Sequence, residues 1–265
     1  LVKVYRDTQD WPKAGKFLGK YQELTNSSNK HKLALYKIQE GRSLIHKKEF
    51  NQSRQTFEDA LNICDDLAAA YYFIGNAYSA ESEEAYQKSL PNETISSSNQ
   101  SESSEQIEEA RKLLGKAIPM WIRYAELKPQ QAWMVIHLLK DGLFELDRFS
   151  EIEDILKQIL KIDKDNIEVI ASLSDILSHR GEDIEAMELI DSAMEQDPTS
   201  LLVKLIKMKH QAKKEKSGNQ YLRGLDDLIH FLVTDERFQV YKNTDTDPDI
   251  IWLYETSAEK ESIPS

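Results

Sequence analysis

The feature that most constrains this chain is a pattern that returns every 34 residues. Residues 166–199 contain two stretches of apolar or small residues at helical spacing, separated by Gly181, and residues 132–165 carry the same pattern one period earlier. The matching positions are Leu139, Leu143, Phe149, Ile152, Leu156 and Ile159 in the earlier period, and Leu173, Leu177, Ala186, Ile190 and Ala193 in the later one. Each period therefore predicts two helices joined by a turn.

A 34-residue period with small residues where two helices cross and a proline at the end, here Pro198, is typical of tetratricopeptide repeats. Small side chains such as Ala186 and Ala193 let the second helix approach the first, and Ile190 fills the groove between them. One repeat cannot bury its apolar face alone, so neighbouring repeats must stack. We therefore predict an all-α fold, a right-handed superhelical solenoid over residues 1–232.

The same spacing continues upstream of these two repeats. The matching positions are Gly41, Leu44, Phe50, Ser53, Phe57 and Ala60 in one repeat, and Tyr71, Ile74, Gly75 and Tyr78 at the start of the next. The chain opens inside a repeat, where Trp11, Ala14 and Leu18 lie on a second helix. We predict four full repeats and a partial one, followed by a further helix pair at residues 200–212 and 222–233.

The third repeat departs from the pattern. Its second helix is due near residue 81, but the matching residues come only at Ala117, Trp121, Tyr124 and Pro129. The extra chain includes residues 91–106, which are rich in Ser, Asn and Glu, so we predict a mobile insertion loop over about 82–106. It is either a tolerated insertion or a regulatory or docking element. Pro119 predicts a kink or a late start in the following helix.

The end of the chain follows a different pattern. FQVYK (238–242) and IIWLY (250–254) are β-prone segments joined by residues rich in Asp and Thr with one Pro. We therefore predict a short C-terminal β-hairpin or tail over residues 233–265.

Three segments resemble the lipopolysaccharide assembly protein B family of bacteria: RDTQDWPKAGKFLGKY near the start, ELDRFSEIEDILKQIL in the middle, and the tail. The resemblance implies a membrane-anchoring helix, a cytoplasmic tetratricopeptide array and a rubredoxin-like metal knuckle at the C-terminus. Laid on this tail, the family pattern puts its aromatic residue on Trp252 and its isoleucine on Ile263. Its four cysteines fall on Val240, Asn243, Tyr254 and Ser257. None of these supplies a thiolate, so the resemblance implies a degenerate knuckle without metal.

Members of that family are adaptors that engage the membrane protease FtsH and promote turnover of the lipid A deacetylase. The resemblance implies a scaffold that links an FtsH-type protease to its client in the cytoplasm, tethered to the inner membrane by an N-terminal helix outside this chain. The sequence begins with Leu1, so we expect a segment of a longer protein. The alternative is a soluble tetratricopeptide protein, unrelated to lipopolysaccharide, that binds a peptide or assembles a complex. A third class is an enzyme whose catalytic domain lies outside these residues.

Charge and residue types narrow the function further. With 46 acidic and 34 basic residues, the net charge of -12 argues against a general nucleic-acid or membrane-surface binder. The basic run at 207–216 is either a solvated helix face or a local patch. Cys64 is the single cysteine, and the six histidines show no metal-binding or catalytic spacing. We therefore predict a non-enzymatic chain with no cofactor and no metal site.

Arrays of this kind bind partners on the concave face, which the first helix of each repeat lines. The inward positions, counted along the repeats, are Arg42, His46, Tyr72, Asn76, His137, Asp141, Phe144, Asp175 and His179. Asn76 is the most suggestive, because the resemblance to tetratricopeptide arrays implies an Asn at this position that holds a peptide backbone through both its carbonyl oxygen and its NH2 group. Leu35, Ile38, Tyr72 and Phe144 would give the groove an apolar floor. We predict a protein or peptide partner in this groove, and the alternative for each residue is a merely solvated position.

Overall fold

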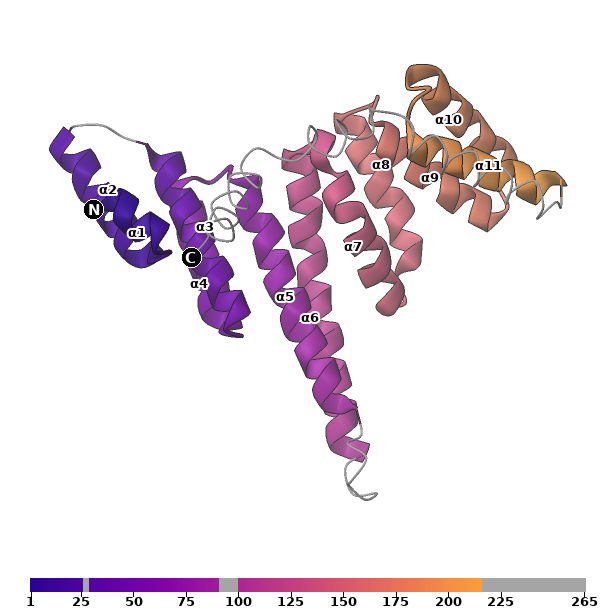
Figure 1. Cartoon of the computed structure of the whole chain (residues 1–265). Coiled ribbons are helices and arrows are strands. Elements are labelled where there is room, and N and C mark those ends of the chain that lie inside the picture. The colour runs from indigo at the N-terminus through magenta and orange to yellow at the C-terminus, as the bar shows by residue number, and fades with distance from the viewer. Residues whose placement is uncertain (26–28, 91–99, 216–265) are drawn as a thin grey trace, which may run out of the picture. The chain divides into compact units, whose positions relative to one another are not determined.

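The computed structural model describes residues 1–25, 29–90 and 100–215, and every regular element in these ranges is helical (Figure 1). The α-helices are α1 Val2–Asp7, α2 Trp11–Thr25, α3 Lys30–His46, α4 Phe50–Ile63, α5 Ala68–Ser89, α6 Gln100–Leu127, α7 Trp133–Glu145, α8 Ile152–Ile162, α9 Ile167–Arg180, α10 Asp183–Gln196 and α11 Leu201–Glu215, with 3-10 turns η1 Pro129–Gln131 and η2 Phe149–Glu151. The predicted all-α class is confirmed. The predicted helix at 222–233 and the tail at 233–265 lie outside the described residues.

The helices group into two compact units. The first comprises Leu1–Leu127 and Leu138–Asp147, and the second comprises Lys128–His137 and residues 148–215. In the first unit each helix from α1 to α6 packs on the next, and α3 also contacts α5. In the second unit α8 packs on α9, α9 on α10 and α10 on α11, and α9 also contacts α11. Contact between successive helices and between successive first helices is the pattern of stacked helix pairs.

The helix positions reproduce the 34-residue period. Helices α7, α9 and α11 begin at Trp133, Ile167 and Leu201, a constant step of 34 residues. The break predicted at Gly181 is also present: this residue follows α9 with φ of 91°, a left-handed conformation that ends a helix and suits glycine. The repeat boundaries read from the sequence are therefore confirmed in this part of the chain.

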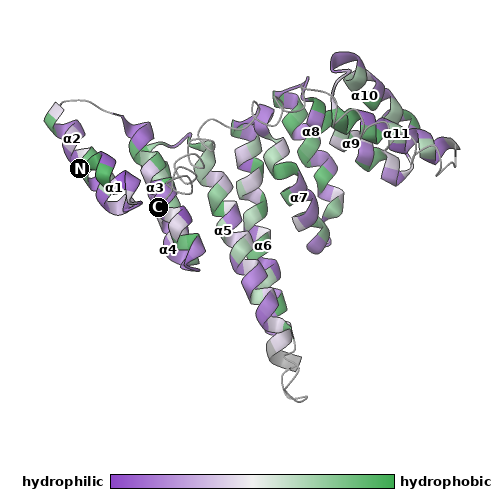
Figure 2. Cartoon of the chain, in the orientation of Figure 1, coloured by the Kyte–Doolittle hydropathy of each residue, from purple (hydrophilic) through white to green (hydrophobic). Residues whose placement is uncertain are grey.

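The residues that the repeat pattern selects on α10 are buried in the second unit. Ala186, Ile190 and Ala193 on α10 have no exposed surface. Ile190 and Ala193 pack in a cluster with Ile170 of α9 and Val203 of α11. Full burial of a side chain such as Ile190 stabilises the fold by about 1.5–3 kcal/mol. Hydrophobic and hydrophilic residues alternate along each helix (Figure 2), as expected when one face is buried and the other solvated.

Two glycines mark the closest helix approaches in the first unit. A Cβ atom placed on Gly75 of α5 would lie 2.5 Å from Nε1 of Trp121 on α6. A Cβ atom on Gly41 of α3 would collide with the ring of Phe57 on α4. Trp121 and Phe57 are both buried. In both repeats an aromatic ring of the second helix therefore fills the space that the glycine leaves, and the predicted place of Trp121 on the displaced second helix is confirmed.

The insertion in the third repeat is more helical than predicted. Helix α5 continues to Ser89 and α6 already begins at Gln100, so the prediction of a loop over about 82–106 is wrong at 82–89 and 100–106. The insertion thus lengthens both helices of one pair, and α5 and α6 extend side by side well past the α3–α4 pair (Figure 1). Residues 91–99 lie outside the described chain.

Local interactions explain why these polar stretches are helical. The hydroxyl of Ser82 on α5 donates to the carbonyl of Ala110 on α6 at 2.7 Å, which joins the two helices through a buried bond. The Glu84 carboxylate lies 2.7 Å from the Lys88 ammonium one turn further along α5. Glu, Gln, Lys and Ala, common here, also favour helix intrinsically. Low hydrophobicity was therefore the wrong criterion for a loop.

Helix α6 runs without a break through Pro119, so the predicted late helix start is wrong. The side chain of Pro119 is exposed, while those of Ile118 and Trp121 are buried against neighbouring helices. The proline removes one hydrogen bond, the one its missing N–H would donate to the carbonyl of Gly115. Packing on the buried face outweighs that loss, and a kink at this position stays a prediction.

The close approach at Gly75 gives a stability test. Replacing Gly75 with Ala forces the buried Trp121 indole to move, so we expect the free energy of unfolding to fall by about 1–3 kcal/mol. Gly115, on α6, is the matched control, because a Cβ there meets nothing within 4 Å. Gly115→Ala is expected to raise stability by about 0.5–1 kcal/mol through its helix propensity. Thermal and urea unfolding followed by circular dichroism measure both, and an unchanged Gly75→Ala protein would contradict the proposed packing.

Candidate functional site

The first helices of the first unit, α3 and α5, bring three of the predicted site residues together around Phe73. The Arg42 guanidinium of α3 lies 5.2 Å from the centroid of the Phe73 ring on α5, and its Nη1 donates to Gln39 Oε1 at 3.1 Å. Tyr72 packs edge-on against the same ring with a centroid distance of 5.0 Å. Arg42, Tyr72 and Asn76 are all half-buried. They form a mixed cationic, aromatic and amide surface, which we call the first-helix face.

Asn76 is tied to the core by a long-range hydrogen bond. The buried Trp121 indole donates through Nε1 to Asn76 Oδ1 at 3.1 Å. This bond orients the side-chain amide with its oxygen toward α6, so the group that Asn76 can direct to a partner is its NH2 donor. The predicted two-sided hold on a peptide backbone is thereby reduced to one side, and a role in binding stays a prediction.

Tyr72 is supported in a similar way. Its ring lies 5.5 Å, centroid to centroid, from that of Tyr124 on α6, which is fully buried. Phe73, 5 % exposed, connects the Arg42, Tyr72 and Phe57 side chains, since its ring also stacks on Phe57 at 5.9 Å. Phe73 was not singled out from the sequence. Its signal was available, because it stands directly beside Tyr72 on a helix whose face was already assigned.

The predicted apolar floor of the groove is partly wrong. Leu35 is 6 % exposed and Ile38 has no exposed surface, because both pack inside the α3 layer of the core. Phe144 on α7, by contrast, is 71 % exposed, and Asp141 and His46 are exposed as well. Helical spacing assigned these five residues to the inward faces of the first helices. It could not show which of the five a neighbouring helix covers.

The remaining predicted residues belong to the second unit. His137 is exposed on α7. Asp175 on α9 accepts from Lys209 Nζ of α11 at 2.6 Å, and His179 Nε2 lies 3.1 Å from the same ammonium. These contacts join two successive first helices, so Asp175 has a structural role in addition to any partner contact. The nine predicted residues are thus divided between the units, six in the first and three in the second.

His210 is a buried polar residue that the sequence did not single out. It is 5 % exposed on α11, with its Nε2 2.8 Å from the Ser174 hydroxyl of α9. Because that hydroxyl donates to the Ala186 carbonyl at 2.6 Å, it accepts from His210, which is therefore protonated on Nε2. Nδ1 is buried with no hydrogen-bond partner among the described residues.

Burial lowers the pKa of His210 below its ordinary value. The charged groups around it oppose one another: Asp175 and Asp183 favour the protonated form, while Lys209 and Lys213 disfavour it. A neutral imidazole between α9 and α11 is the state that this environment stabilises.

The one cysteine of the chain lies in a setting that disfavours its thiolate form. Cys64, at the end of α4, donates its thiol to Asp66 Oδ1 at 3.0 Å, and burial raises its pKa to about 11. It therefore stays protonated at neutral pH and is a poor nucleophile. Among the described residues, no three His, Cys, Asp or Glu side chains gather in a way that could hold a metal ion. Of the helices described, none is long and apolar enough to cross a membrane.

Comparison with known proteins gives fold-level likenesses only. No family model and no curated protein matches the chain. YrrB, a TPR protein with an unusual peptide-binding site, is 18% identical, with 85% of this chain and 97% of that chain covered and a TM-score of 0.41. PilF of Pseudomonas aeruginosa is 12% identical, with 81% and 99% covered and a TM-score of 0.34. The TPR2AB domain of yeast Sti1 in its pHSP90 complex is 18% identical, with 97% and 95% covered and a TM-score of 0.32. All three TM-scores lie below 0.5, so we take no partner or function from them.

The environment of His210 predicts a pH dependence. Its folded-state pKa lies below the ordinary value of ~6.5, so the stability it contributes is present above that pH and is lost as the pH falls toward the folded-state pKa. We expect His210→Gln to be less stable than the natural chain at pH ~7.5, with a smaller difference at pH ~5.5. Urea unfolding at both pH values measures this. His46→Gln, at an exposed histidine, is the control, and an equal pH response in the His210 and His46 variants would contradict the assignment.

Proposed function

We propose that the chain is a non-enzymatic interaction scaffold that holds a segment of a partner protein on the first-helix face of α3 and α5. The observation that supports this most is the anchoring of Arg42, Tyr72 and Asn76 on a buried aromatic base. Half-exposed donors and an aromatic ring are held there by Phe73, Trp121 and Tyr124 from within the core.

Such anchoring favours binding for a physical reason. Side chains whose rotamers are already fixed lose little conformational entropy when a partner docks. An extended peptide presents a row of backbone carbonyls, which suit the Asn76 NH2 group and the Arg42 guanidinium as donors. The Tyr72 ring offers an apolar surface to a side chain of the peptide. The proposed ligand is therefore an extended protein segment, recognised in part through its backbone.

The other predicted residues remain part of the proposal within their own units. His46, Asp141 and Phe144 are exposed residues of the first unit, and Phe144 presents a largely exposed aromatic ring. His137, Asp175 and His179 stay candidate partner contacts in the second unit. There His179 lines an open pocket with Phe149, Ile176 and Arg180.

A variant of the first-helix face tests the proposal. Alanine at Asn76 is unsuitable, because the buried Trp121 indole would lose its acceptor at a cost of about 1–3 kcal/mol. Asn76→Asp keeps an acceptor for Trp121 but removes the NH2 donor, and Arg42→Gln removes the guanidinium of the same face. We expect this double variant to retain at most about a fifth of the partner captured from the native lysate, with a melting temperature within ~2 °C.

Quantitative mass spectrometry of the captured proteins measures the effect. The matched control is Gln55→Ala with Glu58→Ala, two exposed positions on the second helix α4. Equal capture by the first-helix variant and the natural chain would place the partner elsewhere.

The more specific proposal, an adaptor that links an FtsH-type protease to its client in the regulation of lipopolysaccharide synthesis, rests on the sequence resemblance. Such an adaptor would act by raising the effective concentration of the client protein at the protease. Affinity purification of the full-length protein from its own membranes is expected to recover both the protease and the lipid A deacetylase. Recovery of neither, with another complex enriched, would favour the alternative of a soluble peptide-binding or complex-assembly protein.

A further inference from the structure

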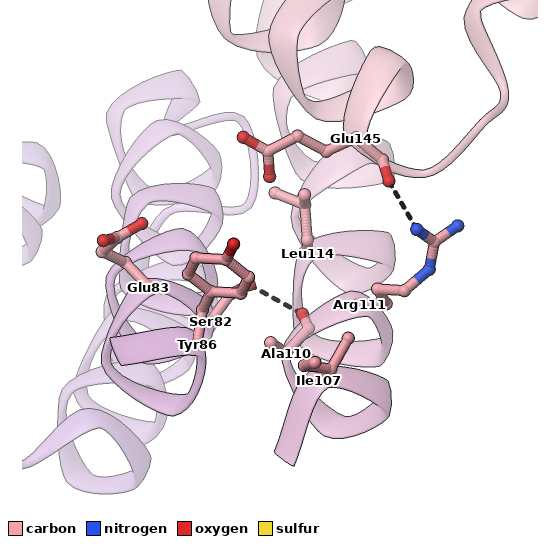
Figure 3. A pocket seen from close by; sticks show the side chains of 8 residues that line it. All are labelled: Ser82, Glu83, Tyr86, Ile107, Ala110, Arg111, Leu114 and Glu145. Atoms are coloured by element: carbon pink, nitrogen blue, oxygen red, sulfur yellow. Dashed lines mark hydrogen bonds between the residues drawn. The ribbon is translucent and has the colours of Figure 1, made fainter. Parts of the chain in front are cut away.

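A pocket lies where the lengthened α5–α6 pair meets the end of α7, all within the first unit (Figure 3). It measures about 300 Å³, and its lining includes Ser82, Glu83, Tyr86, Ile107, Arg111 and Glu145. All but Glu145 come from the extra helical turns or their base. A repeat of ordinary length would have no residues there, so the pocket is a product of the insertion and is separate from the first-helix face.

Buried and capping bonds give this pocket a fixed frame. The Ser82–Ala110 hydrogen bond holds its two long walls together. Arg111 on α6 donates from Nη1 to the Glu145 carbonyl at 2.7 Å and from Nη2 to Asp147 Oδ2 at 2.8 Å. The guanidinium thus caps the C-terminal end of α7, where a positive charge is favourable. Its own charge is offset by Asp147.

The pocket is left acidic with apolar walls. The Glu83 carboxylate accepts from the Gln87 side-chain amide at 2.5 Å, and neither Glu83 nor Glu145 forms an ion pair within the described residues. Tyr86 and Ile107 are large apolar side chains that remain 46 % and 40 % exposed. In Figure 3 the Glu145 side chain reaches toward α5 across Leu114, while Arg111 engages the Glu145 main chain on the other side.

We infer that this pocket binds a short segment of a partner protein that presents a Lys or Arg side chain beside an apolar one. The positive head pairs with Glu83 and Glu145, and its methylene stem lies along the Tyr86 ring and Ile107. The volume suits one long side chain and a neighbour, at the lower end of the range for ligand pockets. The same carboxylates, in a chain of net charge -12, repel an acidic segment.

The test uses a defined probe, the basic peptide acetyl-Gly-Leu-Arg-Trp-Leu-Lys-Gly-amide. The control is an acidic peptide of the same sequence in which Glu replaces both Arg and Lys. Binding to the full chain is measured by calorimetry at low ionic strength, where exposed charge pairs are least screened. We expect the basic peptide to bind and the acidic one not to bind. The double variant Glu83→Gln with Glu145→Gln is expected to weaken binding about fivefold or more.

General attraction to an acidic protein is controlled by Glu58→Gln with Glu188→Gln. These two exposed carboxylates have the same total charge as the pocket pair but lie on α4 and α10. Unchanged affinity in this control supports the pocket, and an equal loss in both double variants overturns it. Failure of the natural chain to bind the basic peptide also overturns it.

A third comparison separates this inference from the proposed function. Asn76→Asp alters the first-helix face and leaves the pocket intact, so it is expected to bind the basic peptide normally. If Asn76→Asp lowers the affinity for the basic peptide and the Glu83→Gln, Glu145→Gln variant does not, the inference about the pocket is wrong. The same result would support binding at the first-helix face.

Discussion

The close approach of paired helices is the constraint on which the first unit depends. At Gly41 and Gly75 a ring from the second helix occupies the space where a side chain would stand. This contact sets how near α4 lies to α3 and α6 to α5. It also has a functional consequence, because the indole that fills the space at Gly75 is the one that donates to Asn76. Core packing and the orientation of a surface amide are therefore set by the same side chain.

The second unit joins its helices by polar contacts in addition to its apolar cluster. Its helices α9, α10 and α11 surround the Ser174 hydroxyl, which donates to the Ala186 carbonyl and accepts from His210. Because this hydroxyl joins three helices, it gives hydrogen bonds to buried polar groups whose burial without a partner would cost free energy. Nδ1 of this imidazole meets no hydrogen-bond partner among the described residues, and burial lowers its pKa. We therefore expect this junction, unlike the aromatic contacts of the first unit, to weaken as the pH falls.

Sequence spacing predicted what is local and missed what is not. The starts of α9 and α11, the turn at Gly181 and the buried Ala186, Ile190 and Ala193 follow from a period that can be counted along the chain. The bond between Asn76 and Trp121 joins residues 45 positions apart, and no periodicity shows it. Burial of Leu35 and Ile38 was missed for the same reason, since a helical face is visible in the sequence but the neighbour that covers it is not. The predicted loop failed because its polar residues stabilise one another within and between two helices.

The insertion shows how a repeat can gain a surface without disturbing the array. Extra turns added to both helices of one pair extend the pair along its own axis and leave the contacts at Gly75 and Trp121 in place. The added surface can therefore differ in chemistry from the first-helix face: Arg42, Tyr72 and Asn76 offer donors and an aromatic ring, whereas Glu83 and Glu145 offer acceptors beside exposed Tyr86. Two surfaces of opposite hydrogen-bonding character suit two different segments. The proposed scaffold, with both surfaces, would select partners by charge as well as by shape.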